Sequence, residues 1–322
     1  MHAYITTVIP VYNGERFLLR TLQSVAAQAL RPDRLVVLDN CSTDDTEKIV
    51  REFQGMKCEW IRNSKNLGLF GNMNRALEFA PQTRYLHILC ADDLITPKFF
   101  ETMIPTLESC RGFGLAFSLD ERINEHGEHL SLSGRVTKVI EEVPVAIYLQ
   151  QKGEIANQTL GGTIYKTNFQ SAPVQFRMDM PILADVVFYA EFGARCEEIV
   201  KVNEVLAQYR WHGTNQSCEL MPGLQSLVLD EWKTMELVEA LRGPSGWVRS
   251  CKLRGLFGVR SGIKARRIRQ LGNQKYSREI VAAGRKISGL PLWFAAQCVV
   301  HVREFVVYGL MRRRRQPNNV FG

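Results

Sequence analysis

Two adjacent aspartates, Asp92 and Asp93, follow directly on an apolar run at residues 85–91. Such a run is typical of a buried strand, and open α/β sheets bind their ligands at the C-terminal ends of their strands. A carboxylate in that position can hold a divalent cation against a phosphate group. The pair therefore favours a nucleotide-dependent enzyme. The alternative is that both aspartates lie in a solvated loop and cap a helix that begins near Thr96 and Pro97.

Three earlier segments have the same organisation, in which a short apolar run precedes polar residues and then a helical pattern. The apolar runs cover residues 4–9, 35–38 and 58–61. Apolar residues at helical spacing begin at Leu18 and at Leu69, and Ser42 is the expected N-cap of the intervening helix, with Asp45 three residues on. Alternating strands and helices predict a mainly parallel sheet between helices, with right-handed crossovers. The polar residues then lie along one edge of that sheet.

The glycine-rich sequences of two common nucleotide-binding loops are absent from the chain. No G-x-G-x-x-G follows any of the predicted strands, and no G-x-x-x-x-G-K-[ST] occurs. Neither a Rossmann dinucleotide site nor a P-loop NTPase is therefore supported.

The segments at the predicted edge resemble, in order, the motifs of the inverting glycosyltransferases of family 2, which have the GT-A fold. Residues 8–13 look like the family's opening strand, residues 39–46 like its D-D-G-S-x-D-x-T segment, and residues 66–74 like its N-x-G…N stretch. Cys90 to Asp93 fall at its D-x-D-D motif, Ala184 and Asp185 at its acidic base, and residues 209–212 resemble its Y-R-x-H signature. The resemblance covers about the first two thirds of the chain. It implies a GT-A domain of the bacterial cell-surface polysaccharide type.

The resemblance implies a binding site for a nucleotide-sugar donor, with UDP as the expected nucleotide. Tyr12 could supply an aromatic face for uracil, and Asp39 an acceptor for the ring N–H. The alternative is that Tyr12 only packs and Asp39 only caps a loop. The expected donor-binding residues are Pro10, Tyr12, Asn13, Asp39, Asn66, Gly68, Asn74, Asp92, Asp93 and Arg210.

The chemistry of the implied transfer requires a cation and a base. A leaving diphosphate develops charge that Mg²⁺ or Mn²⁺ would neutralise, and Asp92 and His212 are the expected ligands. For His212, a hydrogen-bonded structural role is an equal alternative. Inversion at the anomeric carbon requires a base that removes the proton of the acceptor hydroxyl, and Asp185 is expected to be that base, with Glu191 as the fallback. Without the resemblance, the sequence around Asp185 is typical of an acidic residue on a helix surface.

Two residues depart from the family pattern. Cys90 replaces the first aspartate of the D-x-D motif, and because a thiol is a poor ligand for Mg²⁺, we expect Cys90 to be a buried strand-end residue. The metal would then have fewer carboxylate ligands. Ala184 replaces the glutamate often found beside the base. His126 and His129 are expected to lie in a hairpin with Gly127 at its bend, and not in a metal site.

The charge of the chain is divided unequally along its length. Residues 242–322 contain 18 Lys and Arg against two Glu, a balance of +16, and since the whole chain carries +8, residues 1–241 carry −8. The division predicts a GT-A domain at residues 1–220 and a basic, mainly helical region at residues 221–322, with the boundary near residues 221–223.

The basic region combines cationic clusters with aromatic and apolar residues. His301, Arg303 and Glu304 interrupt its last apolar stretch, so a membrane-spanning helix is not expected. We expect instead a helix that lies on an anionic membrane surface. The alternatives are a soluble helical subdomain with a solvated basic face and, ranked last, a nucleic-acid-binding region, for which no motif is present.

The sequence thus predicts a metal-dependent hexosyl- or hexosaminyltransferase that acts on a lipid-linked or cell-surface glycan acceptor at the inner face of the cell membrane. Eight cysteines without a C-x-x-C motif favour the cytoplasm, as does a predicted strand at the N-terminus in place of a signal peptide. Two alternatives stay open. A sugar nucleotidyltransferase would be expected to have a glycine-rich basic loop where residues 11–16 lie, and a degenerate relative would only bind nucleotide or glycan, which Cys90 and Ala184 allow.

Overall fold

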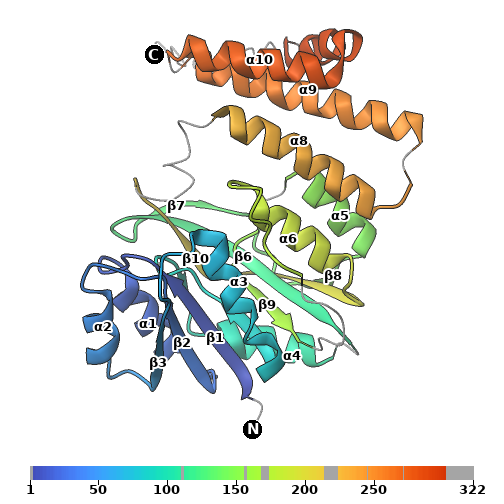
Figure 1. Cartoon of the computed structure of the whole chain (residues 1–322). Helices are drawn as coiled ribbons and strands as arrows, with labels where there is room; N and C mark the ends of the chain where they lie inside the picture. Colours follow the sequence, from blue (N-terminus) through green and yellow to red (C-terminus); the bar gives the residue numbers. More distant parts are fainter. Residues whose placement is uncertain are drawn as a thin grey trace, which may run out of the picture.

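The fold is built on one sheet of ten strands. The computed structural model describes residues 3–109, 112–155, 158–167, 174–213, 224–244, 246–270 and 272–301. Within these residues the strand order is β3-β2-β1-β4-β9-β6-β10-β5, with β7 paired to β6 and β8 paired to β10 (Figure 1).

The first four strands of this order are parallel and alternate with helices along the chain. The elements of this half are β1 (Ala3–Val11), α1 (Leu18–Ala26), β2 (Arg34–Asp39), α2 (Thr46–Glu52), β3 (Cys58–Arg62), α3 (Leu69–Leu77), the 3-10 turn η1 (Ala80–Gln82) and β4 (Thr83–Ile88). The predicted parallel sheet between helices is thereby confirmed. Because all four strands run the same way, their C-terminal ends meet at one edge, as the sequence predicted.

The second half of the sheet is mixed. Its elements are β5 (Leu94–Ile95), α4 (Phe99–Glu108), β6 (Gly114–Asn124), β7 (His129–Leu132), β8 (Ile140–Glu142), α5 (Val145–Gly153), β9 (Thr163–Lys166), α6 (Ala184–Gly193) and β10 (Glu198–Trp211). Strand β9 lies antiparallel between β4 and β6, and β10 runs parallel to β6. The pairing brings the C-terminal end of β10 beside β5, the short strand that directly follows the Asp92-Asp93 pair.

Both faces of the sheet are buried. Alternate residues of β2 point to opposite faces, so Leu35 and Val37 pack with α1 and α4, whereas Val36 and Leu38 pack with α3 and α6. This explains why the strand reads as a continuous apolar run and not as an alternating one.

Three helices of the basic region form a further layer (Figure 1). The first of them packs against α5 and α6, and the other two lie beyond it. The three helices are α8 (Leu224–Leu241), α9 (Trp247–Gln270) and α10 (Gln274–Ser288), and residues 290–301 are also helical. Buried Glu231 of α8 accepts hydrogen bonds from Arg260 and Lys264 of α9, which joins the two helices. No helix in the described part of the chain is both long and apolar enough to cross a bilayer. The boundary expected near residues 221–223 lies outside the described residues.

One local prediction was wrong, one was correct except for a start two residues too early, and one is confirmed. Helix α2 begins at Thr46 with Asp45 as its N-cap residue, so Ser42 does not cap it. The helix expected from Pro97 begins only at Phe99, and Pro105 lies within its last turn. The hairpin between β6 and β7 bends at Gly127, whose φ of 91° suits glycine.

His87, on β4, gives the fold a pH dependence. The ring is fully buried, with Nε2 3.0 Å from the carbonyl oxygen of Gly161, and burial lowers the pKa of His87 from 6.5 to about 4. Between these values the unfolded chain binds a proton that the folded chain does not, so the free energy of unfolding falls as the pH falls.

Urea denaturation should show that the free energy of unfolding falls by about 2 kcal/mol between pH 7 and pH 5 in the wild type, and that this fall is absent in His87→Gln. An equal change of the free energy of unfolding with pH in the wild type and in His87→Gln would contradict this prediction. The control is His129→Gln, at an exposed site.

Candidate functional site

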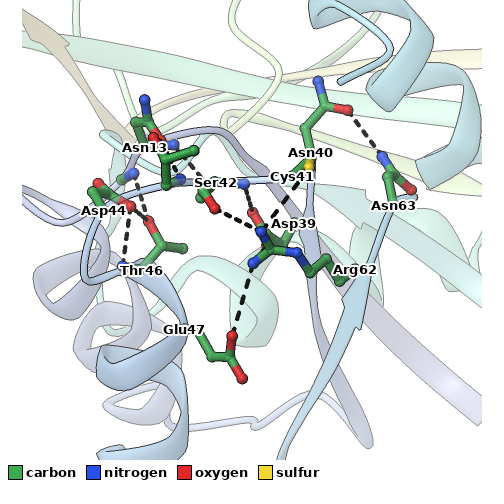
Figure 2. Close-up of polar contacts among 12 residues, drawn as sticks. Asn13, Asp39, Asn40, Cys41, Ser42, Asp44, Thr46, Glu47, Arg62 and Asn63 are labelled. Carbon is green, nitrogen blue, oxygen red and sulfur yellow. Dashed lines mark hydrogen bonds and ion pairs between the residues drawn. The ribbon is translucent and has the colours of Figure 1, made fainter. Parts of the chain in front are cut away.

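The loop after β1 is held by hydroxyl and amide groups of the loop after β2 (Figure 2). The backbone N–H of Asn13 donates to Ser42 Oγ at 2.9 Å, and Asn13 Oδ1 accepts the N–H of Thr43 at 2.9 Å. Asn13 has a φ of 52°, a left-handed conformation that asparagine tolerates better than most residues. Ser42 therefore joins two loops at the sheet edge, which is why it is not available to cap α2.

Asp39 lies at the end of β2 with both carboxylate oxygens engaged. It is 0% exposed, Oδ1 accepts the N–H of Ser42 at 3.0 Å, and Oδ2 accepts Nη1 of Arg62 at 3.1 Å (Figure 2). Arg62 was not among the residues predicted for the site, although it ends β3 directly beside Asp39 in the parallel register. An ionised carboxylate has about four acceptor positions, so Asp39 can still accept one further N–H. Tyr12 directly follows β1, at the same edge of the sheet, and is 50% exposed.

Buried asparagines connect the edge to α3. Asn63 Nδ2 donates to Asn40 Oδ1 at 3.0 Å and to Asn72 Oδ1 at 2.9 Å. Asn40 Nδ2 in turn donates to Asn66 Oδ1 at 2.8 Å and to the carbonyl of Gly68 at 3.1 Å. The amide oxygen of Asn66 is thus used to hold the loop before α3, in which Gly68 has a φ of 73°.

Asn74 lies on α3 and pairs with the backbone of a different segment. Its Nδ2 donates to the carbonyl of Phe176 at 2.9 Å, and its Oδ1 accepts the Phe176 N–H at 2.7 Å. In the described residues Asn74 therefore fixes the chain that leads toward α6.

Two motifs that are far apart in the chain meet at Asp92 and Asp93. His212 Nε2 lies 3.0 Å from Asp92 Oδ2, and the Arg210 guanidinium donates from Nε to the carbonyl of Asp92 at 2.9 Å. Asp93 Oδ1 accepts the backbone N–H of Arg210 at 2.9 Å. Arg210 is 1% exposed and its guanidinium carbon lies 4.9 Å from the centroid of the Phe17 ring. The end of β10 is thus fastened directly to the end of β4.

The acids at this junction have strongly altered proton affinities. Burial, followed by the charge of Asp92, raises the pKa of Asp93 well above its usual range. Burial also raises the pKa of the Cys90 thiol, and the charges of Asp93, Asp92 and Asp185 add to that shift. Asp120 on β6 was missed by the sequence analysis, yet it is buried, its charge raises the pKa of Asp93, and its Oδ2 has no hydrogen-bond partner in the described residues. Burial therefore makes Asp93, Asp120 and the Cys90 thiol harder to ionise than exposed groups, and neighbouring carboxylates add to this effect for Asp93 and Cys90.

The donor atoms at the junction fit a hard divalent cation. One ligand atom each of Cys90, Asp92 and Asp93 lies within 4.8 Å of the others. Carboxylate oxygens suit Mg²⁺ or Mn²⁺, whereas the protonated Cys90 thiol does not. Of the two predicted ligands, Asp92 belongs to this group, whereas His212 does not, although its Nε2 lies 3.0 Å from Asp92 Oδ2.

Asp185 lies in the first turn of α6, where Oδ1 accepts the Val186 N–H at 2.8 Å. Burial raises the pKa of Asp185, so this carboxyl binds a proton more tightly than an exposed one. The charge of Asp185 also raises the pKa of Cys90, the residue two positions before Asp92. Glu191, farther along α6, lies 3.8 Å from the guanidinium of Arg177.

Comparisons with known proteins agree with this geometry. Residues 6–126 match the family model described as Glycosyl transferase family 2. The chain is 32% identical over 130 residues to an uncharacterized glycosyltransferase of Methanocaldococcus jannaschii, covering 39% of this chain and 44% of that protein. It is 29% identical over 89 residues to the UDP-Glc:alpha-D-GlcNAc-diphosphoundecaprenol beta-1,3-glucosyltransferase WfaP of Escherichia coli, covering 28% of this chain and 35% of that protein. The chain thus spans less than half the length of these relatives.

The fold is similar to that of a solved glycosyltransferase structure. The crystal structure of residues 1–349 of S. aureus TarS in complex with UDP-GlcNAc superposes with a TM-score of 0.56 at 14% identity, and the match covers 88% of this chain and 92% of that chain. At this identity the likeness concerns the fold alone.

Proposed function

Since this chain contains a glycosyltransferase domain of family 2 on a GT-A fold, we propose that it transfers a sugar from a UDP-sugar donor to a glycan acceptor in polysaccharide biosynthesis. The observation that supports this most is that the Asp39 and Arg62 pair, at the ends of β2 and β3, lies at the same sheet edge as the Asp92, His212 and Arg210 junction that follows β4. The first group is suited to a planar base and the second to a diphosphate. UDP is favoured because TarS was solved with UDP-GlcNAc and WfaP is named for UDP-Glc.

In this proposal each predicted residue has a defined task. Tyr12 and Asp39 bind the uracil, and Pro10, Asn13, Asn66, Gly68 and Asn74 shape the loops around the donor. Asp93 and Arg210 position Asp92 through the hydrogen bonds between the two strand ends. Asp92 and His212 hold Mg²⁺ or Mn²⁺, which when bound neutralises the charge of the leaving diphosphate.

The proposed transfer inverts the anomeric carbon. Asp185 takes the proton of the acceptor hydroxyl while the nucleotide departs from the opposite face of the sugar. The acceptor is proposed to be a lipid-linked or cell-surface glycan, in keeping with the diphosphoundecaprenol named for WfaP.

The donor site can be tested by calorimetric titration with UDP, GDP and dTDP, each with and without Mn²⁺. We expect UDP to bind and its affinity to fall at least about tenfold without Mn²⁺ or in Asp92→Ala, because the diphosphate then lacks its counter-charge. Glu141→Ala, an exposed carboxylate on β8, is the matched control. Failure of all three nucleotides to bind would contradict the proposal and favour the degenerate relative.

The base can be tested by Asp185→Asn. The variant should still bind UDP with Mn²⁺, whereas the rate of sugar transfer or of slow UDP-sugar hydrolysis should fall about 10²–10⁴-fold, because an amide cannot take up the proton. A variant that retains the wild-type rate would remove Asp185 from the mechanism. Glu191→Gln tests the fallback base in the same assay.

We also propose that the C-terminal helices hold the enzyme on an anionic membrane surface at the inner face of the cell membrane. A groove of about 420 Å³ along α10 is lined by Arg269, Arg278 and Arg285. In the adjoining helix at residues 290–301, Leu290 and Phe294 are exposed, the latter to 62%, although each is large and apolar. Cations beside exposed apolar side chains are typical of helices that bind in a membrane interface, where each Lys or Arg contributes about 1 kcal/mol. Residues 312–315, the most basic run of the chain, lie outside the described residues.

Vesicle flotation tests this placement. Wild-type protein should float with vesicles that contain phosphatidylglycerol but not with pure phosphatidylcholine, and added salt should weaken the binding. The combined variant Arg269→Glu, Arg278→Glu and Arg285→Glu should reduce flotation at least about tenfold, since it reverses three charges in one groove. The control reverses three exposed cations on the GT-A domain, Arg31, Lys48 and Lys57. Equal flotation of both variants would refute the placement.

A further inference from the structure

Lys152, on α5, is a buried lysine. It is 2% exposed, and its Nζ lies 4.9 Å from the centroid of the Tyr148 ring and 5.3 Å from that of the Tyr189 ring. Lysine is almost never fully buried unless its charge is stabilised. The faces of the two aromatic rings attract an ammonium group and account for part of that stabilisation.

The position of Tyr189 relates Lys152 to Asp185. Tyr189 follows Asp185 by one helical turn on α6, so both side chains lie on the same face of that helix. An ammonium group against the Tyr189 ring therefore lies on the face that bears the Asp185 carboxylate. The two charges act on each other: Lys152 lowers the pKa of Asp185, and Asp185 raises that of Lys152. Lys152 of α5 thus lies beside the helix face that contains the predicted base, and its charge acts on Asp185 across that short interval.

Besides Lys152, the described groups on which the charge of Asp185 acts are Cys90 after β4, Tyr165 of β9 and Tyr189 of α6. The cations on the segments next to α6 have other partners: Arg177 lies 3.8 Å from Glu191, and Lys233 of α8 pairs with Asp179. Burial raises the pKa of Asp185, and the charge of Lys152 opposes that shift.

We propose that Lys152 is a positioning residue that keeps the Asp185 carboxylate ionised within its buried setting, an inference that rests on the function proposed above. In the transfer step the acceptor hydroxyl proton passes to Asp185 and the acceptor oxygen bonds to the anomeric carbon. The bond from that carbon to the diphosphate oxygen breaks, and its electron pair leaves with the nucleotide. Lys152 acts only through Asp185 and exchanges no proton in this step.

The effect of Lys152 depends on pH in a defined direction. Burial lowers the pKa of Lys152 to about 7, so the ammonium form dominates only below neutral pH. In that pH range the Asp185 carboxylate is most easily protonated, so the positive charge of Lys152 has its largest effect there. At higher pH Lys152 loses its proton and its charge, so its influence on Asp185 disappears.

The first test compares Lys152→Met and Lys152→Arg with the wild type from about pH 5.5 to 8.5, using release of UDP from UDP-glucose and UDP-N-acetylglucosamine. In Lys152→Met the acidic limb of kcat/KM should move up by about one pH unit, with a loss of about tenfold near pH 6 and less than about twofold at pH 8.5. Lys152→Arg should keep the wild-type limb, and UDP affinity should not change in either. The control is Lys57→Met, an exposed lysine before β3 at the far edge of the sheet. A loss that is uniform across pH would overturn the proposal.

The second test needs no turnover. Because Lys152→Met leaves a buried carboxylate without its counter-charge, the double variant with Asp185→Asn should be more stable to urea than Lys152→Met alone, and should fold even if the single variant does not. A double variant no more stable than the single one would show that the charges are uncoupled and would overturn the inference. If the charges prove coupled but Asp185→Asn releases UDP at the wild-type rate, the proposed base fails and the pairing stands.

Discussion

The constraint on which the site depends is the attachment of the end of β10 to the end of β4 through Arg210. The backbone N–H of Arg210 binds Asp93, and its guanidinium binds the Asp92 carbonyl while it lies against Phe17. The guanidinium also donates to the carbonyl of Asn124 at 3.2 Å, so one buried side chain fastens β4, β6 and α1 together. Removing it would leave buried carbonyls without donors, which costs more than the hydrogen bonds contribute when made. Because of this attachment, His212 reaches Asp92 although the two residues are far apart in the chain.

The sequence was sufficient to predict the first half of the fold. Its strands are short, buried on both faces and separated by helices with one apolar stripe, so each element has a periodicity of its own. The positions of β9, β6 and β10 could not be inferred in this way, because their pairing joins residues far apart in the chain and has no local signal. Ser42 shows the same limit at the level of one side chain. Its local pattern indicated a helix cap, but the Asn13 amide from another loop takes its hydroxyl.

The site residues also divide into those that a local sequence pattern marks and those that only long-range contacts identify. Asp92, Asp93 and Asp185 follow apolar runs and match family motifs, so their sequence positions marked them. Arg62 and Asp120 have no such signal, since a single charged residue at the end of or within a strand does not mark a site by itself. The importance of Arg62 appears only through its contact with Asp39, and that of Asp120 only through its burial near Asp93. The asparagines present a mixed case: the predicted Asn66 lies in a network whose buried members, Asn63 and Asn72, were not singled out. The network holds the loop before α3 through buried hydrogen bonds, and such contacts cannot be predicted from a short motif.

The two ends of the edge differ in how their charge is balanced, and the difference bears on the role of a metal. At the nucleoside end the protein itself balances Asp39 with the guanidinium of Arg62. At the other end Asp92 faces His212, which offers a positive charge only when protonated, and Asp93, Asp120 and Cys90 lie close by. A diphosphate bound there, as proposed above, would add negative charge beside acids whose ionisation is already opposed by burial and by one another. In the proposed reaction a divalent cation at Asp92 would offset the charge of the diphosphate, whereas Asp39 already has the Arg62 guanidinium as its counter-charge.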